Sequence, residues 1–172
     1  GIKLLDGSLA AKGSASVKVK GVDYTIVDAK AGKVTTKDAF ASTATVPVKT
    51  EGNSFSYTVG LSDGTSVTVK LTTQKDPNDP EGKKGQIVGE DGTVYATTAS
   101  LAGTGFSKAD IQSAMLKALK ANDKLVDQFK ISGTGGAYVF ENIESGRTGV
   151  TQITSLGWEV RDANGALDKN ST

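Results

Sequence analysis

Apolar and polar residues alternate along several short stretches of the chain, and this is the pattern of strands that bury one face. Residues 16–20 read SVKVK, and after a Gly-Val-Asp corner the chain continues with YTIV at 24–27. The lysines then fall on the solvent-facing side, where they also disfavour edge-to-edge pairing with another sheet. These residues predict a half-buried β-hairpin.

The same alternation predicts three further strands, at 44–50, 55–61 and 66–72. The last two are joined by SDGT, and its Asp63-Gly64 pair is a strong hairpin-turn signal. Successive residues of a strand point to opposite faces, so each strand presents its apolar residues on one side. The residues expected to face the core are Phe55, Tyr57 and Val59 in one strand and Val67, Val69 and Leu71 in the next.

A polar segment, KDPNDPEGKKG at 75–85, interrupts the strands and holds two of the three prolines of the chain. Prolines and glycines with almost no apolar residue between them indicate a loop. A short hairpin is predicted after this loop, with strands at 86–89 and 93–97 on either side of EDG.

One segment has the helical period. It begins with SKAD, which fits a capping box. In this motif the Ser107 side chain accepts a hydrogen bond from an early helical N–H, and the Asp110 side chain accepts one from the Ser107 backbone N–H. The apolar stripe of the predicted helix, about 107–121, consists of Ile111, Ala114, Met115, Ala118 and Leu119, and the polar face of Lys108, Gln112, Lys117 and Lys120. This pattern predicts an amphipathic helix with one face packed on a sheet.

Strand patterns return after the helix. The predicted elements are strands at 129–131 and 138–140, a GTGG turn at 133–136, a longer strand between 148 and 153, and a last apolar pair, Trp158 and Val160. The fold class is therefore α+β, mainly antiparallel β, with small sheets and one packed amphipathic helix.

Composition narrows the possible functions. At 172 residues the chain is expected to form one domain. Its 20 basic and 19 acidic residues are interspersed and give a net charge of +1, which indicates neither a nucleic-acid partner nor an anionic membrane partner. Apolar runs are far shorter than the roughly 20 residues that cross a bilayer. Cysteine and histidine are absent, which excludes Cys- and His-based catalysis and Cys/His zinc sites, so an enzyme is not expected.

The opening residues and a longer central segment resemble one protein family. GIKLLDGS, at 1–8, closely resembles the segment of bacterial flagellins where the chain leaves the first long helix of the filament core for the variable outer domain. Residues 55–149 are similar to the strand-helix-strand unit of flagellins, hook-associated proteins and filament-cap proteins. LSDGTSVTVKL, SKADIQSAMLKALKAN and FKISGTGGAYVFENIESGRTG carry this second likeness. In that unit the helix lies over a small sheet.

The resemblance implies a structural, extracellular component of the bacterial flagellar filament that supports motility and presents a variable, antigenic surface. Its partners are then other flagellin subunits, bound through helices outside this sequence, and host antibodies or glycans. The isolated fragment is expected to be a monomer. The alternatives are a hook-associated or filament-cap protein domain, or a secreted adhesin-like module that binds glycans.

The resemblance also implies how the chain is divided. Residues 1–8 are a connector from the helical core, 9–163 a β-rich body with the strand-helix unit at about 54–155, and 164–172 a return connector. An inserted domain returns the chain to the place where it left, so the ends are expected to be adjacent, with Leu4 close to Leu167.

Three motifs admit a functional and a plainer interpretation. Asp76, Asp79 and Glu81 put oxygen ligands in one loop, as in calcium sites, but Glu81 stands where the EF-hand requires glycine, so a solvated loop is expected. GTGG at 133–136 lacks the Gly-Lys-Ser/Thr of a phosphate loop and is expected to be a turn. GTG at 103–105 precedes the helix, where anions bind, but helix entry is the plainer interpretation.

The remaining candidate residues are carboxylate pairs, aromatic residues and a glycosylation motif, and none of them is predicted to form a functional site. The carboxylate pairs Glu90/Asp91 and Glu141/Glu144 would serve glycosidic chemistry only if a cleft held two carboxylates roughly 5 to 10 Å apart. The residues expected in the core rather than on a sugar-stacking surface are Met115, Phe55, Tyr57, Tyr138, Phe140 and Trp158, with Trp158 the one to watch for partial exposure. Asn170 begins a formal N-glycosylation motif at the end of the chain. No catalytic, cofactor or metal-binding residue is predicted.

Overall fold

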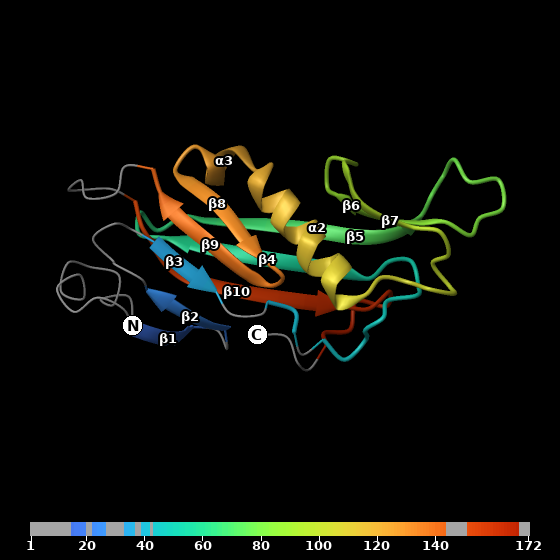
Figure 1. Cartoon of the computed structure of the whole chain (residues 1–172), viewed down its shortest axis with the longest axis horizontal. Coiled ribbons are helices and arrows are strands. Elements are labelled where there is room, and N and C mark those ends of the chain that lie inside the picture. Colours follow the sequence, from blue (N-terminus) through green and yellow to red (C-terminus); the bar gives the residue numbers. More distant parts are fainter. Residues whose placement is uncertain are drawn as a thin grey trace.

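A computed structural model describes residues 15–19, 22–26, 33–36, 39–41, 43–143 and 151–168. Within these residues the chain forms two antiparallel five-stranded sheets and few helices (Figure 1). The first sheet has the order β1 (Ala15–Val19), β2 (Val22–Ile26), β3 (Lys33–Thr36), β9 (Ala137–Asn142), β8 (Phe129–Thr134). The second has the order β10 (Ile153–Arg161), β4 (Ser54–Leu61), β5 (Ser66–Lys75), β6 (Gly85–Gly89), β7 (Val94–Thr98). The predicted fold class, α+β and mainly antiparallel β, is confirmed.

The first sheet joins the two halves of the chain. The predicted β1–β2 hairpin is present, with Val17 opposite Tyr24, but the orientation of its lysines falls outside the side chains that the structure describes. β3, which the pattern did not predict, pairs with β2 on one side and with β9 on the other. Strands at the beginning and near the end of the sequence therefore share one sheet.

The β4–β5 hairpin of the second sheet follows the prediction closely. Leu61 N–H donates to the Thr65 carbonyl at 2.8 Å, and Gly64 adopts a φ of +87°. Glycine tolerates this left-handed conformation, which closes a three-residue turn. β5 runs three residues further than predicted, to Lys75. The expected core faces of both strands are buried.

The predicted helix is present as α2 (Lys108–Lys120), and Ser107 and Asp110 form the predicted capping box. α2 packs against β5, β7 and β8, so it lies between elements of both sheets (Figure 1). Its five predicted stripe residues are buried. Gln112, predicted on the polar face, is also buried, because a helix with neighbours on two sides covers more than one stripe.

Two strand predictions are corrected, and one short helix was not predicted. Residues 44–50 form no strand, since Pro47 has no N–H to donate and only Val48 pairs, with Phe106. The strand expected between 148 and 153 begins at Ile153 and continues through Trp158 and Val160; a register shift near Ser155 breaks the alternation that would have revealed it. A one-turn helix, α3 (Asp123–Val126), follows α2 unpredicted, with Asn122 as its cap.

A cluster of aromatic rings fills the space between the sheets. Phe40, at a φ of +63°, lies 5.1 Å from the Trp158 ring and 6.2 Å from the Phe55 ring, measured between centroids. Tyr57 on β4 meets Tyr138 on β9 at 5.5 Å. The aromatic residues and Met115 therefore lie in the core, as predicted, and Trp158 is only 5% exposed.

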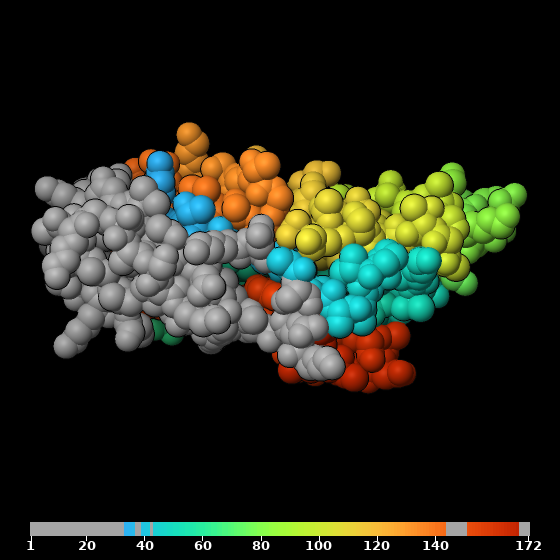
Figure 2. All heavy atoms as spheres, turned by 60° about the horizontal axis from the view of Figure 1, so that its bottom comes forward, coloured from blue at the N-terminus to red at the C-terminus, as the bar shows by residue number. Residues whose placement is uncertain are grey.

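The C-terminal part of the described chain folds back on the segment around residue 44. The Ala44 N–H donates to an Asp168 carboxylate oxygen at 2.9 Å, and Figure 2 shows the cyan segment against the red one. The loop after β5 projects at one extremity of the molecule, in green. Residues 1–8 and 169–172 lie outside the described residues, so the adjacency of Leu4 and Leu167 remains a prediction.

Candidate functional site

A buried polar network joins α2 to the turn of the β8–β9 hairpin. The Gln112 side-chain amide donates to the Ala39 carbonyl at 2.7 Å, and the Tyr138 hydroxyl donates to the Gln112 carbonyl at 2.8 Å. The Thr36 hydroxyl donates to the Gly136 carbonyl at 3.2 Å and accepts the Tyr138 N–H at 3.0 Å. Each group has a partner on another element, so the network fixes the packing and carries no free reactive group.

The hydroxyl groups of the two buried tyrosines, Tyr57 and Tyr138, differ in whether they have a hydrogen-bond partner. Burial raises the pKa of both Tyr57 and Tyr138, so both hydroxyls stay protonated at physiological pH. The Tyr57 hydroxyl lies near Thr36 but has no partner at hydrogen-bonding geometry, whereas the Tyr138 hydroxyl is paired.

Removing the hydroxyl is therefore expected to destabilise the protein at Tyr138 and not at Tyr57. Tyr138→Phe loses a buried bond and leaves the Gln112 carbonyl without that donor, which costs about 1–2 kcal/mol of unfolding free energy. Tyr57→Phe removes a buried polar atom that has no partner, so stability is unchanged or increases. Urea unfolding of the two variants measures the difference. Equal losses in both would show that the Tyr57 hydroxyl is hydrogen-bonded in solution.

The carboxylates of the loop at 76–84 close the loop itself. Asp79 accepts from the backbone N–H groups of Glu81, Lys83 and Lys84, at 3.1, 2.8 and 2.7 Å. Asp76 accepts from the Asn78 N–H at 2.8 Å. No group of three acidic side chains suited to a metal ion is found in the part of the chain that the structure describes. The Asp76 and Asp79 carboxylates therefore cap the turns of this loop.

Asp79 gives this loop a predictable response to acid. Its bond from the Lys84 N–H is the largest cause that lowers the pKa of the carboxyl. A carboxyl with a lowered folded pKa stabilises the loop above its ordinary pKa, about 3.9, and loses this effect as the pH falls through the folded value. We expect the Lys83 and Lys84 amide signals in NMR spectra to move with a midpoint below that of a model aspartate, and not to move in Asp79→Asn. A midpoint at or above the ordinary value would contradict this.

The other motifs considered in the sequence analysis also have structural roles. The turn predicted at 133–136 is shorter in the structure, because Gly133 and Thr134 belong to β8 and residues 135–136 alone turn the chain into β9. The start of α2 is closed by its own capping box. Asp91 accepts from the Thr93 N–H at 3.0 Å, and Glu141 lies 3.8 Å from the Lys33 ammonium. Glu144 and Asn170 lie outside the described residues. Among the described candidates, Glu90 and Asp91 line one hollow together, and Asp76, Asp79, Glu81 and Glu141 do not line it.

A first hollow, of about 320 Å³, lies at the base of the projecting loop. Lys49, Lys75 and Lys83 line it together with Glu51. One Glu51 oxygen accepts the Lys75 N–H at 3.0 Å, and of the three lysines only Lys83 has an ion-pair partner among the described residues, at 3.6 Å. The surplus of positive charge makes this hollow suited to an anionic group.

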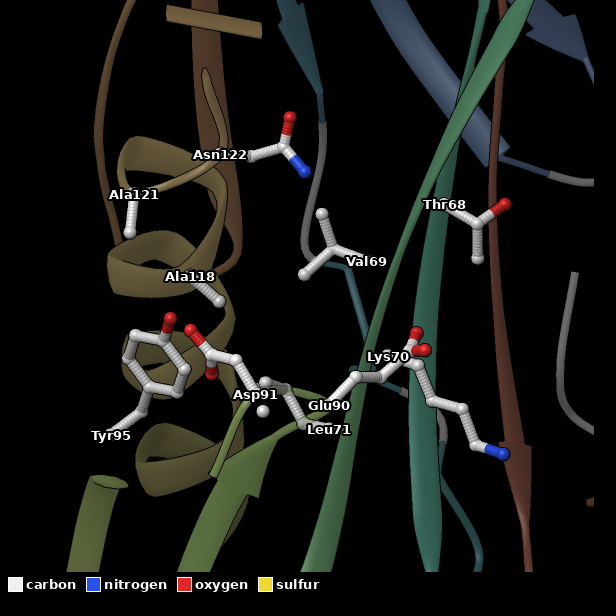
Figure 3. A pocket seen from close by; sticks show the side chains of 11 residues that line it. Thr68, Val69, Lys70, Leu71, Glu90, Asp91, Tyr95, Ala118, Ala121 and Asn122 are labelled. Carbon is white, nitrogen blue, oxygen red and sulfur yellow. The ribbon is translucent and has the colours of Figure 1, made fainter. Parts of the chain in front are cut away.

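A second hollow, of about 260 Å³, lies between the edge of β5 and the C-terminal end of α2 (Figure 3). Lys70 belongs to its β5 wall, Asp91 and Tyr95 to the β6–β7 hairpin, and Ala118 to the helix. Figure 3 draws the Asp91 carboxylate beside the Tyr95 ring and Ala118. Sequence reasoning missed both hollows, because each depends on where a strand ends rather than on a motif.

Comparison of the chain with protein-family models, with curated proteins and with solved structures finds no match. Among the described helices, none has the length and apolar character that crossing a bilayer requires.

Proposed function

We propose that this chain is the surface-exposed outer domain of a flagellin, a non-enzymatic structural part of the extracellular flagellar filament. The observation that carries the proposal is the opening GIKLLDGS, which resembles the exit from the first core helix of flagellins. In this role the domain acts through its fold and its surface. It contributes to the texture and antigenicity of the filament, and neighbouring subunits assemble through helices outside this sequence.

Features of the described structure support this proposal. The hairpin β4–β5, the capped helix α2 and the hairpin β8–β9 follow one another in the order of the family's strand-helix-strand unit. The described part exposes three large apolar residues: Val94 at the start of β7, Ile143 directly after β9, and Leu167 after β10. Asp63, Asp79 and Asp91, in the loops at 62–65, 76–84 and 90–93, each accept a hydrogen bond from a backbone N–H of their own loop. A surface of this kind suits a solvent-facing spacer.

The lysine-lined hollow favours one alternative, a secreted module that binds acidic glycans. Lys49 and Lys75 have no carboxylate partner among the described residues, and the hollow has the size of a small-ligand site. A sialylated or sulfated oligosaccharide array distinguishes the two functions. Saturable binding that Lys75→Gln weakens would favour the glycan-binding module, whereas a filament spacer shows no such binding.

The distance between the two ends of the chain tests the main proposal. Because the chain has no native cysteine, Leu4→Cys and Leu167→Cys can carry a pair of spin labels. An inserted outer domain is expected to give one short distance, comparable to the roughly 10 Å between packed elements. A distance like the length of the ten-residue β5, about 34 Å, would contradict the insertion.

The same labels test the expected monomer. A sample labelled only at residue 167, an exposed position, should give no intermolecular distance. Sedimentation at micromolar concentration should give one species of about the chain's mass, 17.7 kDa. A stable dimer would contradict the expectation that assembly needs helices outside this sequence.

A further inference from the structure

β5 is longer than β6, the strand that pairs with it on the side away from β4. Its last register partner in β6 is Gly89, which lies opposite Leu71, and the chain then turns away into β7. From Ser66 to Lys70, β5 pairs with β4 only, among the residues that the structure describes. Half of this central strand is therefore a sheet edge.

The hydrogen bonds at the two ends of the β4–β5 ladder fix which backbone groups face that edge. Leu61 N–H donates to Thr65 O at 2.8 Å, and Thr73 N–H donates to Asn53 O at 2.9 Å. Residues alternate along an antiparallel ladder, so Val67, Val69 and Leu71 also bond to β4. The N–H and C=O groups of Thr68 and Lys70 then point away from β4, toward the place that β6 has left.

These groups open into the hollow between β5 and α2, whose lining includes residues 68–71 (Figure 3). Opposite them, Ala118 of the helix and then Ala121 and Asn122, directly after it, line the hollow. The negative end of the α2 dipole lies on this side, together with the carboxylates of Glu90 and Asp91, and the lining also includes one basic residue, Lys70. Lys117 and Lys120 of the same turn are exposed and are not part of the lining.

We propose that this edge binds an extended peptide segment of a partner protein by strand addition, with a basic side chain in the hollow. The segment takes the place that β6 leaves and pairs with the Thr68 and Lys70 backbone. Its residue opposite Val69 shares the inner face of the sheet and so points toward α2. There a lysine or arginine packs its stem on the alanines and places its charge near Asp91.

The walls of the hollow determine this choice of occupant. The β6–β7 turn bounds it on one side and the end of α2 on the other, so a single strand fits at the usual spacing of about 4.8 Å. A second copy of the chain would bring its own β5 flanked by the same two elements. A single peptide segment has no such flanks.

A phage-displayed library of random heptapeptides, selected on the immobilised protein, tests the proposal. The enriched peptides are expected to carry a lysine or arginine flanked by β-formers, and to protect the Thr68 and Lys70 amides from hydrogen exchange. Thr68→Pro removes an N–H that faces the edge and should weaken binding about tenfold or more. Thr68→Ala, which keeps that N–H, is the matched control and should bind like the original protein.

The charge is tested separately, by a variant that preserves the turn. Asp91→Asn keeps an acceptor for the Thr93 N–H and should weaken binding of the basic peptides about tenfold. This variant and the amide protection remain informative if Thr68→Pro does not fold. Failure to enrich any peptide, enriched peptides without a basic residue, equal binding by Asp91→Asn, or protection elsewhere than Thr68 and Lys70 overturns the proposal.

Discussion

Phe40→Ala is expected to lower the unfolding free energy by about 3–5 kcal/mol, the range found when a buried phenylalanine is truncated. The Phe40 side chain is fully buried and contacts the rings of Phe55 and Tyr57 on β4 and of Trp158 on the neighbouring strand β10. Its loss leaves a cavity where the segment at 39–41 meets the core. Denaturant unfolding, followed by the fluorescence of the single tryptophan, measures the change.

The matched control for this variant is Ile143→Ala. Ile143 is a large apolar residue of the described chain that is 59% exposed, so its truncation should change stability by no more than about 0.5 kcal/mol. A loss of under 1 kcal/mol in Phe40→Ala would contradict the packing of Phe40 against Trp158. That result would mean that the segment at 39–41 does not belong to the core in solution.

Gly105→Ala is expected to cost about 2–4 kcal/mol, from two effects that act together. Gly105 has a φ of +66°, which disfavours any side chain, and an added Cβ would lie 2.5 Å from the Val48 carbonyl oxygen. The backbone there must move, and with it the bridge between Val48 and Phe106 that leads into α2. Chemical denaturation, with circular dichroism of the helix as the signal, measures the loss.

Gly64→Ala separates the two effects. Gly64 has a φ of +87°, but an added Cβ would meet nothing within 4 Å, so only the conformational cost of about 1 kcal/mol remains. Equal losses in the two variants would show that Val48 moves aside freely, and would contradict the close contact at the entrance of α2.

Local patterns predicted the elements whose signals are complete within a few residues. The Ser107 capping box with its apolar stripe predicted α2, and the Asp63-Gly64 turn predicted the β4–β5 hairpin. Both depend on spacing and on turn chemistry, which neighbouring residues alone determine. The ends of α2 and of β4 were predicted to within one residue, whereas β5 runs three residues further than predicted.

Features that depend on distant partners were not predicted. β3 is a four-residue strand held by β2 and β9 on its two sides, and Gln112 is buried because the β8–β9 turn lies over that face of the helix. The hollow at the β5 edge exists because β6 ends at Gly89, the residue at which its pairing with β5 stops, while β5 extends back from Leu71 to Ser66. The candidate sites depend on contacts between segments that are distant in sequence, so a short motif does not reveal them.

Immunogold labelling of intact bacteria that express this protein tests the proposed function most directly. Antibodies raised against the purified 172-residue domain are used, because an outer domain of the filament is accessible without permeabilising the cell. The proposal predicts gold particles along the whole length of the flagellar filaments and none on cells from which the flagella have been sheared. Labelling of the cell body or of soluble secreted protein, with unlabelled filaments, would contradict it.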